Sequence, residues 1–252
     1  MKIALSAGHT LSGKGTGAVG YINEGNETRV MFNLVKKWLV ADGHTVYACN
    51  VDKSDTYLKQ QVALANKQSV DVAVQIHFNA GGGTGTETLH DLGSTKGKEF
   101  ATRVNAKLAT VFKNRGAKSR NDLYWLNNTK APAILIEICF VDSKTDTTYY
   151  NANKDKIAKL IAEGIVGKSI SASAGYQVGD YHKDVIVDTG DGSNLNVRSG
   201  RGAEYSKIGS FANGTRVNVW YIAKASDGSL WGSCSCNGQT GYIHMGYTRP
   251  AK

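Results

Sequence analysis

The segment Val70–Ala80, VDVAVQIHFNA, constrains the fold of this chain more than any other stretch. It begins as an apolar run of the kind that forms a strand covered on both faces of a sheet. It ends in His77 and Asn79, and residues 81–83 are all glycine. A polar group at the end of a buried strand, beside a glycine-rich loop, is where α/β proteins place ligands. A histidine satisfied within the core is the other interpretation, and this segment alone does not separate the two.

Strand-like and helix-like segments alternate over residues 1–168. Strands are expected at Lys2–Ala7, His44–Cys49, Val70–His77, Thr86–His90, Leu123–Leu126 and Pro132–Cys139. Helical spacing predicts helices from about Asn26 to Gly43 and over Ser54–Lys67, Glu99–Phe112 and Asp155–Val166. This alternation predicts an α/β layered domain around a mostly parallel sheet.

The composition changes after Lys168. The small, polar residues of Ser169–Gly175 are typical of a linker, which we expect over residues 169–178. Residues 179–252 lack helical periodicity, and turn pairs such as Asp191-Gly192 and Asn213-Gly214 separate short alternating segments. The expected strands are Asp184–Val187, Leu195–Arg198, Ile208–Phe211, Arg216–Tyr221, Leu230–Cys234 and Thr240–His244. They predict a small all-β barrel.

The formal net charge of +9 is unevenly distributed. Residues 1–168 hold 22 basic and 15 acidic side chains, and residues 169–252 hold 8 and 6. A basic surface favours anionic partners, although it can also serve solubility alone. No basic cluster is interleaved with aromatic residues, which argues against nucleic acid as a partner.

Targeting and redox signals are sparse. No run of 18 apolar residues exists, so no membrane association of that kind is expected. The N-terminal stretch MKIALSAGHT lacks the apolar region and cleavage site of a signal peptide, which predicts synthesis in a cytoplasm and release by another route. The four cysteines form no zinc-binding pattern and are expected to be buried or free thiols.

Polar side chains follow three of the expected strands. His9, His77 and Glu137 lie at strand ends or in the loops after them, and Glu24 closes the first loop. Because the carboxyl ends of parallel strands share one edge of a sheet, we expect these side chains to meet. Two imidazoles and one carboxylate are the ligands of a catalytic zinc ion. A second carboxylate nearby can then act as general base and later as general acid.

Other interpretations compete at single positions. Glu137 stands among isoleucines and leucine, where a buried salt bridge is the alternative to a catalytic role. Glu27 lies three residues after Glu24 and could equally occupy a helix face. His90 lies on an expected strand, and a supporting role at the site stays open for it.

Four motifs carry a family resemblance. Ala7-Gly8-His9, Asn23-Glu24, the segment Gln75–Ala80 and the segment Pro132–Glu137 resemble the zinc-dependent N-acetylmuramoyl-L-alanine amidases. The segment Phe112–Leu126 resembles amidase endolysins of phages that infect clostridia.

The resemblance covers about residues 1–168 and implies roles for four residues. It implies that His9, Glu24 and His77 bind Zn²⁺ and that Glu137 is the catalytic acid and base. The distance back from Gly43-His44 in the family pattern selects Glu24 over Glu27. Asn79, two residues after His77 and so on the same side of an extended chain, is a candidate to bind substrate.

Two positions depart from the family pattern. Ser6-Ala7 stands where the family usually has Asp-Pro, and Gln75-Ile76 stands where it tends to have Ser or Glu-Leu before the second histidine. Neither departure changes a ligand. Both could alter the groove beside the metal.

A second resemblance covers about residues 182–249. Leu195–Gly200, Gly214–Val217 and Thr240–Ile243 resemble a bacterial Src-homology-3-like domain that binds the cell wall. Trp231 and Tyr242 could line its groove or belong to its core.

Together the two resemblances imply a peptidoglycan hydrolase. It would cleave the amide between N-acetylmuramic acid and L-alanine, as a phage or prophage endolysin, with the wall polymer as partner of its C-terminal domain. A zinc peptidase acting within the stem peptide is the alternative. A wall-binding protein with an inactive metal site is a third possibility, against which the presence of all four site residues argues.

Overall fold

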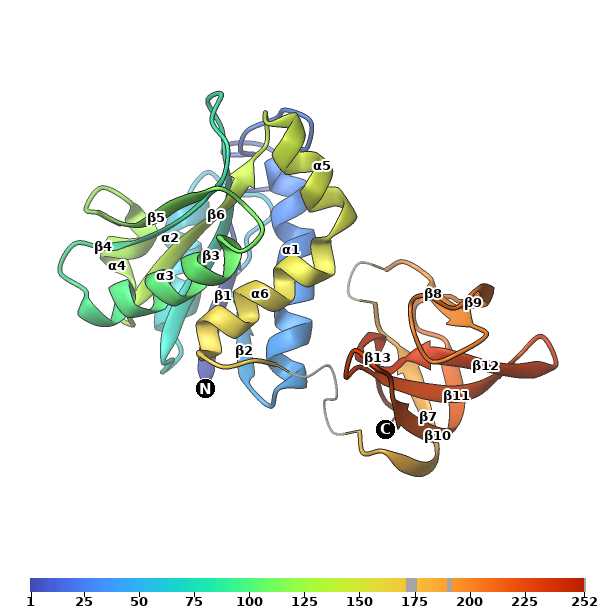
Figure 1. The fold of residues 1–252 in the computed structure, drawn as a ribbon. Coiled ribbons are helices and arrows are strands. Elements are labelled where there is room, and N and C mark those ends of the chain that lie inside the picture. Colours follow the sequence, from blue (N-terminus) through green and yellow to red (C-terminus); the bar gives the residue numbers. More distant parts are fainter. Residues whose placement is uncertain (171–175, 190–191, 252) are drawn as a thin grey trace. The chain divides into compact units, whose positions relative to one another are not determined.

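The computed structural model describes residues 1–170, 176–189 and 192–251, and these form two compact units (Figure 1). The first unit ends at Ile170, and the second lies in the C-terminal region. The expected linker at 169–178 and the turn at Asp191-Gly192 fall partly outside the described residues. No helix among the described residues is both long and apolar enough to cross a membrane.

The first unit alternates strands and helices along the chain. In order, its elements are β1 (Lys2–Ala7), α1 (Glu24–Ala41), β2 (Thr45–Ala48), α2 (Tyr57–Asn66), β3 (Val72–Asn79), β4 (Thr86–Asp91), α3 (Thr95–Leu108), β5 (Asn114–Arg120), α4 (Tyr124–Asn128), β6 (Ala133–Phe140), α5 (Lys144–Ala152) and α6 (Lys154–Val166).

The six strands form one sheet in the order β2-β1-β3-β6-β4-β5. The first four are parallel to one another, β4 runs antiparallel to β6, and β5 runs parallel to β4. The predicted α/β fold with a mostly parallel sheet is therefore confirmed. Because β6 lies between β3 and β4, the carboxyl ends of β3 and β6 are neighbours, beside the start of β4.

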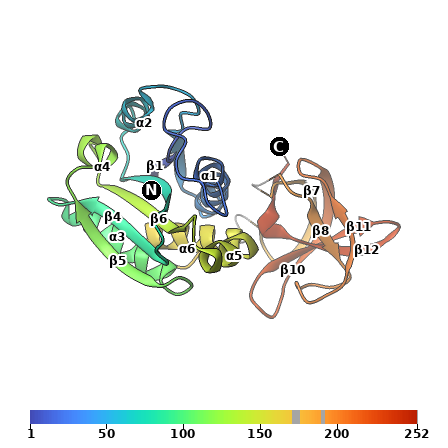
Figure 2. The ribbon, with the colours of Figure 1, turned by 90° about the horizontal axis from the view of Figure 1, so that it is seen from above.

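Helices cover both faces of this sheet (Figure 2). The helices α2 and α4 lie on one face, where Ala4, Ala73, Ala133 and Leu135 contribute to a buried cluster. The helices α1, α3, α5 and α6 lie on the other. Since strand side chains alternate between faces, Gln75 and His77 share the α2 face with Ala73. The end of β3 thus presents a polar pair inside an otherwise apolar layer.

One predicted strand is wrong. Leu123–Leu126 is not a strand, because α4 begins at Tyr124. Trp125 and Leu126 are adjacent and both buried in the α2 cluster, which a helical turn permits and the alternation of a strand does not. The helix predicted at Glu99–Phe112 begins earlier, at Thr95, because the Ser94 side chain accepts the Gly97 N–H.

Two carboxylates hold the turn between β3 and β4. Asp142 Oδ2 accepts the N–H groups of Gly81 and Gly82, both at 2.8 Å. Asp146, buried near the start of α5, accepts the Gly85 N–H at 2.8 Å and the Phe140 N–H at 3.1 Å, and its other oxygen accepts the Thr84 hydroxyl at 2.7 Å. Helix α5 thereby fixes the loop that leads from the end of β3 into β4.

The second unit is a seven-stranded antiparallel sheet. Its strands are β7 (Gly179–Val187), β8 (Leu195–Arg198), β9 (Lys207–Phe211), β10 (Arg216–Lys224), β11 (Leu230–Cys236), β12 (Gln239–His244) and β13 (Thr248–Pro250), in the order β13-β7-β10-β11-β12-β8-β9. Val197 and Ile243 lie in its buried core, as alternation predicts. The six predicted strands are all present.

All four cysteines are buried free thiols. Burial raises the pKa of Cys49 and of Cys234 to about 12, so neither thiol is a nucleophile near neutral pH. The expectation of unpaired cysteines is confirmed.

Candidate metal centre

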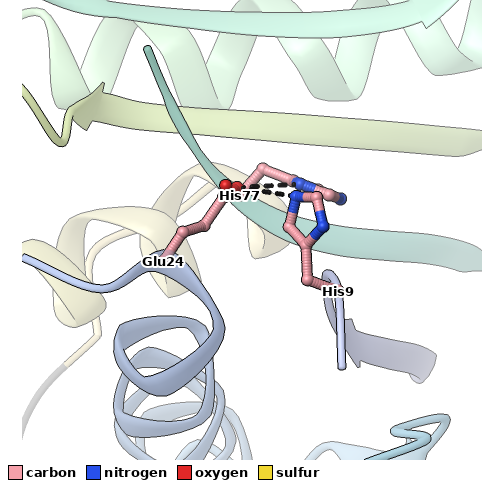
Figure 3. A group of neighbouring side chains, drawn as sticks. All are labelled: His9, Glu24 and His77. Atoms are coloured by element: carbon pink, nitrogen blue, oxygen red, sulfur yellow. Dashed lines mark hydrogen bonds and ion pairs between the residues drawn. The ribbon is translucent and has the colours of Figure 1, made fainter. Parts of the chain in front are cut away.

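Three elements bring His9, Glu24 and His77 together (Figure 3). His9 follows the end of β1, Glu24 is the first residue of α1, and His77 lies near the end of β3. Their ligand atoms lie within 4.8 Å of one another, and they form the one such group of histidine, cysteine or acidic residues in the described part of the chain. The predicted convergence of these three residues is what the structure shows.

Glu24 contacts both histidines of the group. Its Oε1 lies 3.1 Å from His9 Nε2 and 3.1 Å from His77 Nδ1, and it accepts the Phe78 N–H at 3.0 Å. Its Oε2 accepts the Ala18 N–H at 2.9 Å. Burial alone would raise the pKa of Glu24, but the adjacent imidazoles of His77 and His9 outweigh it and hold the pKa well below its usual value. Glu24 is therefore a fixed, ionised carboxylate.

Glycines make room for the group. A Cβ at Gly8 would lie 2.3 Å from His77 Nε2, and one at Gly17 would lie 2.8 Å from Glu24 Oε2. Gly17 also has φ of +83°, which favours glycine. The loop backbone thus contacts the ring and the carboxylate directly, and any side chain at position 8 would displace His77.

Arg29 on α1 fixes the backbone that carries His9. His9 has φ of 64°, a left-handed conformation that is unusual for a residue other than glycine. Arg29 Nη2 donates to the His9 carbonyl at 2.9 Å, and the Thr28 hydroxyl donates to the Gly8 carbonyl at 3.1 Å. These contacts stabilise a local geometry that His9 alone would not favour.

Glu137 lies beside this group on the next strand. It pairs in register with His77 of β3 and with Glu87 of β4, so the three side chains share one face of the sheet. Its Oε2 is buried and has no hydrogen-bond partner. Burial, then the charges of Glu24 and Glu87, raise the pKa of Glu137 to about 8, against the opposing charge of Arg120. A carboxyl in this state can hold a proton near neutral pH.

Two of the competing residues lie elsewhere. Glu27 accepts the Tyr150 hydroxyl and the Lys154 ammonium, both at 2.7 Å. The Nδ1 of His90 lies 2.8 Å from the Asp91 carbonyl. Neither belongs to the group formed by His9, Glu24 and His77.

Asn79 and the unpredicted Glu87 are linked. The Asn79 amide donates to Glu87 Oε1 at 2.8 Å, while Glu87 Oε2 also accepts bonds from Arg115 and Lys118. Burial would raise the pKa of Glu87, but Lys118 and Arg115 lower it overall. The sequence offered one signal for Glu87, a carboxylate on an expected strand, which is the same signal that singled out Glu137.

The residues present fit a metal ion. The Gly15 carbonyl, 3.1 Å from His9 Nδ1, can only accept, so His9 donates Nδ1–H to it and keeps the Nε2 lone pair for the site. Tetrahedral ligands with bonds of about 2.0–2.2 Å lie about 3.3–3.6 Å apart, close to the observed separations. Electron-pair donors that converge in this way repel unless a cation lies between them.

Two imidazoles and a carboxylate at one edge of a mostly parallel α/β sheet make up the ligand set of a catalytic metal site. The chain belongs to the N-acetylmuramoyl-L-alanine amidase family, whose pattern matches residues 3–167. The bacterial SH3 domain family matches residues 193–249.

Similar proteins cover the chain to different extents. An uncharacterized protein of Clostridium perfringens is 33% identical to this chain, and the match covers 87% of this chain and 68% of that protein. The endolysin of Bacillus phage SPP1 is 31% identical over 64% of this chain and 61% of its own length. A solved catalytic domain, that of the CD27L endolysin targeting Clostridia Difficile, is 36% identical with a TM-score of 0.64, covering 68% of this chain and 99% of that one.

Proposed function

We propose that this protein is a zinc-dependent peptidoglycan amidase that cleaves the bond between N-acetylmuramic acid and L-alanine, as an endolysin does. One observation carries the proposal: Glu137, with an unpartnered Oε2, lies in register beside His77 of a metal-ligand group in a chain of the amidase family. The endolysins among the similar proteins support the lytic role.

His9, Glu24 and His77 would hold the ion through Nε2, a carboxylate oxygen and Nδ1. When bound, zinc supplies a Lewis acid that polarises the amide carbonyl and activates water. In its ionised form, Glu137 would take the proton of the attacking water, and it would then return that proton to the leaving amine. Asn79, whose amide is directed by Glu87, would contact substrate beside this position.

The two units of the chain would have different functions. Residues 1–168 would form the catalytic domain, 169–178 the linker and 179–252 a cell-wall-binding domain, in line with the two families that match. Peptidoglycan is the expected partner of both domains. The protein would act on the wall after release from the cell that makes it.

Digestion of purified Gram-positive walls tests the reaction. An amidase releases new amino groups without new reducing ends. Its products are glycan strands whose muramic acid has a free lactyl carboxylate, and peptides that begin with an N-terminal alanine. A peptidase would leave alanine on muramic acid in the mass spectrum of the products, and new reducing ends would show a glycosidase. Either result would overturn the proposal.

The roles of the residues need separate measurements. Metal analysis of purified protein, with a chelator and reconstitution series, identifies the ion. Glu137→Gln should bind zinc as tightly as the parent and lose at least about a hundredfold in rate. Full lytic activity of this variant would contradict the role given to Glu137.

A further inference from the structure

A chain of buried amides runs from strand β1 to His77. The His77 Nε2 lies 3.1 Å from Gln75 Oε1, and Gln75 Nε2 donates to Gln61 Oε1 at 2.9 Å. Gln61 Nε2 donates in turn to the carbonyl of Ala7 at 3.0 Å. Gln61 is 0% exposed and Gln75 is 1% exposed, so water cannot replace any of these contacts. We call these two side chains the amide relay.

The amide relay has a fixed direction. The Ala7 carbonyl can only accept, so Gln61 must present its NH₂ group there and its oxygen to Gln75. Gln75 must then present its NH₂ group to Gln61 and its oxygen to His77. Reversing either amide would set two oxygens or two donors against each other in a buried site.

This direction decides which nitrogen of His77 carries hydrogen. An oxygen at Gln75 requires the Nε2–H form of the ring, which leaves the Nδ1 lone pair facing Glu24 Oε1. Glu24 favours the other tautomer of His77. A carboxylate stabilises an N–H at Nδ1 more strongly than a neutral amide stabilises one at Nε2. A hydrogen on Nδ1 would remove the lone pair that a metal ion needs.

We propose that Gln61 and Gln75 are positioning residues for the metal site. They hold His77 in the Nε2–H form against the pull of Glu24 and thereby keep Nδ1 available to a divalent metal ion. This inference rests on the metal site of the proposed function. It concerns the position, Gln75, at which the chain departs from the amidase pattern.

The test measures zinc affinity and the imidazole tautomer in the full chain. Gln75→Met keeps the length of the side chain but removes the acceptor, so zinc should bind at least about tenfold more weakly. Long-range ¹H–¹⁵N NMR of the metal-free protein, at a pH where the ring is neutral, should show His77 shifting from Nε2–H toward Nδ1–H. Gln61→Met, which frees the amide of Gln75 without deleting it, should give smaller changes of the same sign.

Gln60→Met is the matched control. Gln60 is exposed on the same helix, and its side-chain amide donates to the hydroxyl groups of Ser54 and Thr56. It should leave zinc affinity and the His77 signals unchanged. Thermal unfolding of each metal-free variant reports whether a change in affinity reflects a loss of fold.

The outcomes separate this inference from the proposed function. Unchanged zinc affinity and an unchanged tautomer in a folded Gln75→Met protein would overturn the positioning role and leave the amidase proposal standing. Zinc bound to Nε2 of His77 in the parent protein would overturn it as well. A parent protein that binds no zinc would refute both the metal site and the inference that rests on it.

Discussion

At the residue scale, Glu137 shows how its neighbours set the chemistry of one side chain. Burial and the charges of Glu24 and Glu87 all favour its protonated form, and Arg120 opposes them. The pKa of Glu137 thus depends on residues of three adjacent strands, β6, β4 and β5, and on Glu24 at the N-terminus of α1. An exposed glutamate would be ionised under the same conditions.

The raised pKa predicts a pH-dependent difference in stability for the metal-free protein. Native Glu137 keeps its proton up to about pH 8, while the unfolded chain loses it above 4.5, so the parent protein loses stability across this window as pH rises. Glu137→Gln cannot ionise and should gain in melting temperature relative to the parent over the same window. If the melting temperatures of the two proteins, measured with chelator present, change in parallel with pH between 4.5 and about 8, the raised pKa of Glu137 is contradicted.

Some residues of the site could be recognised from the sequence pattern, and others could not. His9, His77 and Glu137 could be singled out because each interrupts or follows an apolar run, whereas Glu24 was selected over Glu27 only through the family resemblance. The role of Gln61 could not, because a helical glutamine reads as a solvated side chain until its contact with the Ala7 carbonyl is known. Whether a polar residue of α2 is buried depends on the residues of the sheet that pack against the helix.

At the element scale, the missed elements were those without an apolar pattern. The edge strand β5, NRGAKSR, has no alternation of apolar residues, and its place beside β4 comes from sheet pairing. Helix α5, KTDTTYYNA, has few apolar residues and was not expected at all. The central strands, which are mostly apolar, were predicted to within about two residues.

Helix α5 gives a prediction at this scale. Asp146→Ala should lower the free energy of unfolding of the first unit by about 3 kcal/mol, because Thr84, Gly85 and Phe140 lose a shared acceptor where water does not replace it. Chemical denaturation followed by helical circular dichroism measures this change.

Asp142→Ala is the matched control for that prediction. Asp142 also accepts two N–H groups of the same loop, but it is exposed, so water can take its place. The Asp142→Ala substitution should lower the free energy of unfolding by less than about 1 kcal/mol. Equal losses for the two variants would show that the burial of Asp146 does not matter.

At the scale of the whole molecule, the chain joins an α/β unit and an antiparallel unit, each with its own buried core. The change of periodicity after Lys168 was enough to predict both classes. The sequence could not predict that β6 lies between β3 and β4, because the order of strands in a sheet follows from packing between distant segments.

Truncation after Ile170 tests the division between the units. The shortened protein should cleave a small soluble muropeptide at the parental rate, because the site lies wholly in the first unit. Lysis of intact walls should fall by about a hundredfold as linked binding is lost. Equal loss on both substrates would show that the second unit is needed for catalysis, and no loss on walls would exclude a binding role.

The directed amides between Ala7 and His77 also have an evolutionary consequence. A mutation at position 61 or 75 alone leaves the amide at the other position with a buried group unsatisfied, so a substitution at one position favours a compensating substitution at the other. Among descendants of one ancestor, these two positions should therefore change together, and lineages with glutamine at one should carry it at the other.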